Sequence, residues 1–166
     1  MISKNANTPS KGIQELINTV SILRSPSTGC PWDLEQTHIS LIPYLLEEAY
    51  EVVDAIRYED EKNLKEELGD LLLQVILHAQ IAQERQSFCL EDIAIGINDK
   101  LIRRHPHVFG EKKIKTVDEA KKSWQEIKIA ERASTKNTTY LSTELKNKIR
   151  SKPAISGSIE ISKAVA

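Results

Sequence analysis

Two short stretches of the sequence carry Asp and Glu residues at helical spacing. Glu48 and Glu51 are three positions apart, as are Glu67 and Asp70, so each pair shares one surface if its stretch is helical. A short connection between two helices demands antiparallel packing, which lets the two pairs converge. Facing carboxylates repel one another unless a hard divalent cation lies among them, and ligation by oxygen alone favours Mg²⁺ or Mn²⁺ over zinc. The spacing therefore predicts a magnesium site.

The alternative interpretation is an acidic surface exposed to water, which is what charge runs on helices usually are. The helical positions argue against it. At about 100° per residue, each acidic pair lies at about 300° and 240° from the first leucine of its own helix, Leu45 or Leu64. Apolar residues flank Glu67 and Asp70 on both sides, and a buried carboxylate needs a partner.

The elements that position these residues are expected to be helices. Apolar residues recurring at i, i+3, i+4 and i+7 predict an all-α fold with no strands. The expected helices span residues 12–24, 43–58, 64–85, 90–104 and 117–133, with loops at 25–33 and 105–115. Pro43 suits a first helical turn, Asn63 is the expected N-cap of the third helix with Glu66 as its capping-box partner, and Thr116 is the expected cap of the last.

The third expected helix is apolar on more than one face. Its main apolar stripe, which we expect to face the core, consists of Leu68, Leu71, Leu72, Val75 and Ala79. A single layer of four or five short helices cannot cover every such face when aromatic residues are only 5% of the chain. The sequence therefore predicts a homo-oligomer that associates through its helices.

Length, charge and cysteine content narrow the class of protein. The 166 residues suit one domain, expected at 12–133, with a flexible leader at 1–11 and a loosely ordered or partly helical tail at 134–166. A net charge of -1 disfavours nucleic-acid binding, and the absence of long apolar runs argues against a membrane protein. Cys30 and Cys89 lack the spacing of a metal site, so we expect free thiols and a cytoplasmic location.

Five sequence blocks resemble a known family. The acidic stretches, EEAYE at 47–51 and ELGD at 67–70, are similar to the EExxE…ExxD signature of the MazG-type nucleoside triphosphate pyrophosphohydrolases, in the all-α NTP pyrophosphatase superfamily. The resemblance extends over about residues 12–133. Its blocks are LRSPSTGCPWDLEQTH (23–38), YLLEEAYEVVDAI (44–56), LKEELGDLLLQVILHAQIA (64–82), NDKLIRRHPHVFG (98–110) and WQEIKIAER (124–132).

The resemblance implies a fold and an activity. The fold is a four-helix-type bundle core with an extra amphipathic helix, assembled into a dimer or a dimer of dimers. The activity is Mg²⁺-dependent hydrolysis of an NTP or dNTP to a nucleoside monophosphate and pyrophosphate, as housekeeping of the nucleotide pool. Glu48, Glu51, Glu67 and Asp70 would hold the metal. The alternative function is a non-catalytic helical dimer that binds nucleotide or a protein partner.

The basic residues of the later blocks are candidates for contacts with the triphosphate. Lys100, Arg104, Trp124 and Lys128 match family positions, and the three cations would stabilise charge on the triphosphate and on the departing pyrophosphate. Arg103 either shares this role or complements the dipole at the end of its helix.

Weaker signals surround these residues. Glu47 is a candidate general base because it adjoins the expected ligands, and Trp32 and Trp124 would either stack on a base or fill the core. His105 and His107 are expected to fix their own loop. The single Glu-x-x-His, from Glu35 to His38, does not make the di-iron site of ferritin-like bundles, which needs two such motifs.

Overall fold

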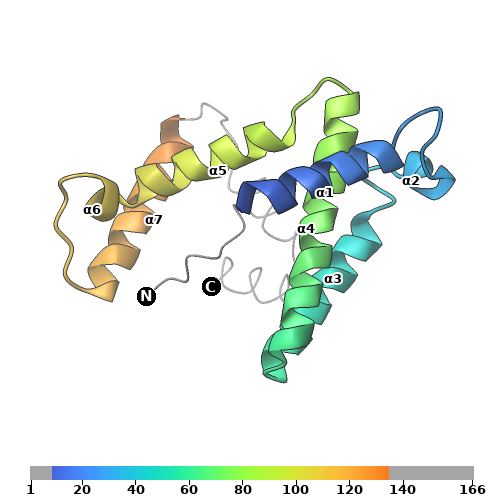
Figure 1. Cartoon of the computed structure of the whole chain (residues 1–166). Helices are drawn as coiled ribbons and strands as arrows, with labels where there is room; N and C mark the ends of the chain where they lie inside the picture. The colour runs from blue at the N-terminus through green and yellow to red at the C-terminus, as the bar shows by residue number, and fades with distance from the viewer. Residues whose placement is uncertain (1–8, 135–166) are drawn as a thin grey trace, which may run out of the picture. The chain divides into compact units, whose positions relative to one another are not determined.

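The computed structural model describes residues 9–134, and every regular element among them is an α-helix (Figure 1). The helices are α1 (Pro9–Leu23), α2 (Pro31–Glu35), α3 (Ile42–Arg57), α4 (Glu61–Glu84), α5 (Leu90–Arg104), α6 (Pro106–Phe109) and α7 (Val117–Ser134). The expected all-α class is therefore confirmed for this part of the chain. The expected leader and tail lie almost entirely outside the described residues, although α1 begins three residues before the predicted start.

The described helices fall into two compact units, one ending at Lys100 and the other beginning at Leu101. Two short helices occupy segments that we expected to be loops, α2 after Cys30 and α6 after His105. Each begins with a proline, whose missing N–H costs nothing in a first turn and whose fixed φ favours a helical start.

A tight connection joins α3 to α4 and makes them pack side by side (Figure 1). The N-cap of α4 is Asp60, whose carboxylate accepts hydrogen bonds from the backbone N–H groups of Lys62 (3.1 Å) and Asn63 (3.0 Å). The prediction of Asn63 as N-cap was therefore wrong, because Asp60 caps one turn earlier. The predicted convergence of the two acidic stretches depends on this pairing of α3 and α4.

The core of the first unit lies where α1 crosses α4. Its fully buried members are Val20, Leu41, Ile76, Leu77 and Ile81. The stripe that we expected to face the core is only partly inside. Leu68, Leu72 and Val75 are 49%, 39% and 37% exposed, whereas Ala79 is buried. The prediction was wrong for these three residues, because α1 covers the other apolar side of α4.

Arg24 holds the segment after α1 against the end of α4. Its guanidinium donates Nε and Nη2 to the two carboxylate oxygens of Glu84, at 2.8 and 2.7 Å. It also donates Nη1 to the backbone carbonyl oxygens of Asp33 and, at 3.3 Å, Gln36. The same segment makes a close turn at Gly29, where a Cβ would collide with backbone oxygen. We call these contacts of Arg24 the Arg24 clamp.

Arg24→Ala is expected to lower the free energy of unfolding by about 2–3 kcal/mol, because it removes a buried donor from three partners while Glu84 keeps access to water. The matched control is Arg57→Ala, whose exposed ion pair with Asp54 should contribute less than about 0.5 kcal/mol. Urea unfolding of both variants measures the difference. Equal losses would contradict the importance of the Arg24 clamp.

The clamp also predicts a pH dependence. Hydrogen bonds from Arg24 hold the pKa of Glu84 below its ordinary value of 4.5. A lowered carboxyl pKa stabilises the fold above the ordinary value, and the stabilisation disappears as the pH falls through the lowered one. The advantage of the wild type over Arg24→Ala should therefore shrink below about pH 4.5.

The second unit begins with the last turn of α5. Thr116 caps α7 as predicted, since its Oγ1 accepts from the backbone N–H of Glu119, and the Glu119 carboxylate accepts from the backbone N–H of Thr116, which completes a capping box that we did not predict. Lys112 donates to the buried Ser123 at 2.8 Å and fastens the preceding loop to α7. Among the described helices, none is both long and apolar enough to cross a bilayer.

Candidate active site

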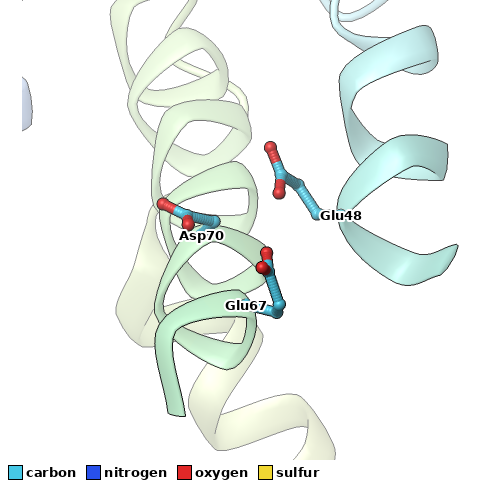
Figure 2. A group of neighbouring side chains, drawn as sticks. All are labelled: Glu48, Glu67 and Asp70. Atoms are coloured by element: carbon cyan, nitrogen blue, oxygen red, sulfur yellow. The ribbon is translucent and has the colours of Figure 1, made fainter. Parts of the chain in front are cut away.

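Three carboxylates from α3 and α4 converge in the first unit. Glu48 extends from α3 toward α4, while Glu67 and Asp70 lie one turn apart on α4 (Figure 2). One oxygen from each of the three lies within 4.8 Å of the others, and all three residues are half-buried. The i, i+3 spacing places Glu67 and Asp70 together, and the pairing of the helices brings Glu48 opposite them. We call these three residues the carboxylate cluster.

Glu51, the fourth predicted ligand, touches the cluster from an exposed position. Burial raises the pKa of Glu67, and the charges of Glu51 and Asp70 and a side-chain hydrogen bond with Glu51 raise it further. Burial likewise raises the pKa of Glu48, with added repulsion from Asp70, Glu51 and Glu67. All four predicted ligands therefore interact, while Glu47 is exposed and acts on Glu48 only through its charge.

The donor set fits a hard divalent cation. It consists of oxygen atoms alone, and burial together with the neighbouring negative charges raises the pKa of Glu48 and of Glu67. A dication among these oxygens would reverse that repulsion, and Mg²⁺ and Mn²⁺ take such ligands. Neither histidine nor cysteine is part of the cluster, so its chemistry does not match a zinc site.

A second group of charged residues lies in the second unit and is centred on Glu131. Arg104 donates Nε (3.1 Å) and Nη2 (2.7 Å) to Oε2 of Glu131, and Arg103 donates Nε to Oε1 at 2.6 Å. The Arg104 guanidinium also lies over the ring of Trp124, 5.0 Å from its centroid. Both arginines thus share one carboxylate. Interaction with the dipole at the end of their helix is therefore not their sole role.

Sequence reasoning missed Glu131. Its signal was present in the spacing of α7, because Trp124, Lys128 and Glu131 stand at i, i+4 and i+7 and so share one face. Hydrogen bonds from Arg104 and Arg103 lower the pKa of Glu131 to about 2. Lys128 is half-buried on the same helix.

A hollow of about 490 Å³ adjoins this group. Arg104, His105, His107, Lys121 and Trp124 line it together with Ala120 and Gln125. His105 Nδ1 lies 2.7 Å from the carbonyl oxygen of Leu101, so this histidine fixes its own backbone as expected. His107 Nδ1 is buried and has no hydrogen-bond partner within the described part of the chain.

The remaining predicted residues take separate positions. Lys100 is exposed on α5. Trp32 is 48% exposed, so it does not fill the core, and its ring packs edge-on against Tyr44 with 5.6 Å between centroids.

His38 has a partner that sequence reasoning did not identify. Its ring stacks on His78 of α4, and the two Nδ1 atoms are 2.8 Å apart. Burial, with a smaller effect of His38, lowers the pKa of His78. The pair lies forty positions apart in the sequence, so no local spacing could have indicated it.

The chain is similar to several known proteins. Residues 36–109 match the MazG nucleotide pyrophosphohydrolase domain family. The chain is 50% identical over 125 residues to the nucleoside triphosphate pyrophosphohydrolase/pyrophosphatase MazG of Thermotoga maritima, covering 75% of this chain and 47% of that protein. It is 50% identical over 121 residues to a nucleoside triphosphate pyrophosphohydrolase of Escherichia coli, covering 73% and 46%. The chain thus spans about half the length of these relatives.

A solved structure supplies the corresponding comparison of folds. The crystal structure of a mazG-related protein from Thermotoga maritima superposes with a TM-score of 0.58 at 34% sequence identity, covering 69% of this chain and 97% of that one. The segment that carries the carboxylate cluster lies inside the matched residues 36–109. The chain therefore belongs to the family of MazG nucleotide pyrophosphohydrolase domains.

Proposed function

We propose that this protein is a Mg²⁺-dependent nucleoside triphosphate pyrophosphohydrolase that converts NTPs or dNTPs to monophosphate and pyrophosphate, as part of nucleotide-pool housekeeping. The observation that carries the proposal is the convergence of Glu48, Glu67 and Asp70 within 4.8 Å. Relatives that are 50% identical carry the name of this activity, which supports the same reaction here.

The metal would be held by the carboxylate cluster together with Glu51. Mg²⁺, or Mn²⁺ in its place, supplies positive charge against the phosphates and lowers the pKa of a bound water. Burial and the neighbouring carboxylates raise the pKa of Glu48 and of Glu67, so a cation among these oxygens would relieve an electrostatic cost. Glu47, exposed beside Glu48, is the proposed acceptor of the proton from the attacking water.

The cations that a triphosphate needs are concentrated late in the chain. Residues 101–134 carry nine Lys or Arg against five Asp or Glu, whereas residues 9–100 carry seven against seventeen. We assign the phosphate contacts to Lys100, Arg104 and Lys128, with Arg103 beside them, because polyphosphate charge requires such donors. Trp124 and Trp32 are the proposed stacking surfaces for the base.

The reaction predicts its products. Incubation with each common NTP and dNTP and Mg²⁺ should yield monophosphate and pyrophosphate, because donors on the outer phosphates stabilise pyrophosphate as it departs. Phosphorus NMR at early times distinguishes the products, and EDTA should stop their formation. Early nucleoside diphosphate and inorganic phosphate would contradict the proposed bond cleavage. Binding without turnover for every nucleotide would instead favour the non-catalytic helical dimer.

We also propose that the protein assembles into a homo-oligomer through α3 and α4, as a dimer or a dimer of dimers. Exposed apolar residues recur at helical spacing on both helices. They are Leu46, Tyr50 and Val53 on α3, and Leu68, Leu72 and Val75 on α4. A second copy would cover these faces, and two α3–α4 pairs would form the four-helix-type core.

A further inference from the structure

The guanidinium of Arg104 is held along one edge and on one face. Its Nε and Nη2 both donate to the same oxygen, Oε2 of Glu131, and its Cζ lies over the Trp124 ring, 5.0 Å from the ring centroid. The side chain is only 15% exposed, so the two contacts define its orientation in a restricted space. No hydrogen bond from Nη1 of Arg104 occurs within residues 9–134. Glu131 therefore binds the Nε side of the guanidinium, and Nη1 can donate to a ligand.

Arg103 is held by the other oxygen of the same carboxylate. It donates Nε to Oε1 of Glu131 at 2.6 Å, while 53% of its side chain is exposed. Two adjacent guanidinium groups repel each other, and a carboxylate between them removes the cost of keeping them close. With a pKa of about 2, Glu131 remains ionised at any pH near neutrality, so it holds both arginines throughout that range.

We propose that Glu131 is a positioning residue, which orients the Arg104 guanidinium on Trp124 so that its free Nη end meets a phosphate oxygen of the substrate. This inference deepens the proposed function and rests on it. Donors fixed before the substrate arrives contribute most when charge develops, because they need no reorganisation at that moment. Arg104 also lines the 490 Å³ hollow, whose volume is sufficient for an anion.

The opposite role would make Glu131 a competitor that neutralises the arginines and weakens substrate binding. The two roles predict opposite effects on the rate. A competitor would occupy both terminal nitrogens of Arg104, whereas Glu131 accepts from the Nε of both arginines and from only one terminal nitrogen, Nη2 of Arg104. The geometry therefore favours positioning.

The kinetic test compares Glu131→Gln and Glu131→Ala with Glu126→Gln, a matched change of charge at an exposed position of the same helix. The Glu131 variants should lower kcat about 10- to 100-fold, because an arginine that is misplaced by an ångström loses much of its effect. KM should stay level or fall, because removing a carboxylate leaves more positive charge for the polyanion. Glu126→Gln should behave like the wild type. Unchanged kcat, or a raised kcat in the Glu131 variants, would overturn the proposal.

A second readout does not depend on turnover. The side-chain Nε–H resonances of Arg103 and Arg104 should be distinct in the wild type and should merge with those of exposed arginines in Glu131→Gln. Titration with inorganic pyrophosphate should shift the Arg104 resonance in the wild type and leave no such resonance to shift in the variant. If no nucleotide is hydrolysed, the proposed function fails, yet this titration still decides the role of Glu131. The proposed role of Glu131 would be refuted if the distinct Arg104 resonance persisted in Glu131→Gln, or if pyrophosphate did not shift it in the wild type.

Discussion

Glu67→Gln and Asp70→Asn are each expected to reduce Mg²⁺-dependent hydrolysis by about a thousandfold or more, because a bound metal contributes several kcal/mol to such reactions. Both changes keep the shape of the side chain and remove one charge from the carboxylate cluster. The measurement is pyrophosphate release at saturating Mg²⁺. Glu66→Gln is the matched control, since it removes the same charge from the neighbouring exposed position on α4.

Stability in metal-free buffer completes this test. Burial and like charges raise the pKa of Glu67, so removing a charge from the cluster should leave Tm unchanged or raise it. Mg²⁺ should then raise the Tm of the wild type and of Glu66→Gln more than that of the two ligand variants. Turnover that survives both ligand substitutions would show that the metal assignment is wrong. A clear loss of metal-free stability in both would indicate structural pairing instead.

Leu72→Asp is expected to split the homo-oligomer into subunits. Leu72 is 39% exposed in the single chain, and on the proposed assembly it is covered by a second copy. In a two-fold symmetric interface each subunit would bury one new carboxylate. The dissociation constant of the oligomer should therefore rise about a hundredfold or more. Sedimentation of the variant over a range of concentrations measures the change.

The control for this prediction is Ile22→Asp, which places the same charge on an exposed apolar residue of α1 outside the proposed interface. This variant should keep the mass of the wild type. A wild-type protein that is monomeric and folded at micromolar concentration would contradict the assembly. Equal dissociation by Leu72→Asp and Ile22→Asp would mean that the contact surface lies elsewhere.

Sequence patterns predicted the parts of the fold that depend on near neighbours. The pairing of Glu67 with Asp70 follows from one turn of helix, and the approach of Glu48 follows from the short link between α3 and α4. Helix ends were predicted less accurately. Asp60 and Asn63 are both good N-cap residues, and only the local backbone conformation selects one of them.

Contacts between residues that lie far apart in the sequence could not be predicted. Glu131 meets Arg103 and Arg104 across the loop between α5 and α7, and His38 meets His78 across forty positions. The exposed stripe of Leu68, Leu72 and Val75 was assigned to the core because periodicity identifies an apolar face without saying which neighbour covers it. These features depend on how helices meet, and the sequence pattern of one helix carries no information on that.

The Arg24 clamp has a consequence for the order in which the chain assembles. It joins positions 24 and 84, so its contacts have a high sequence separation and form only after a long loop has closed. The short helix α2 is held through the same guanidinium, by way of the Asp33 carbonyl. Amide hydrogens of α2 and of the last turn of α4 therefore belong to one cooperative opening unit. When the end of α4 frays, α2 loses its anchor, and the segment around Trp32 becomes exchangeable at the same time.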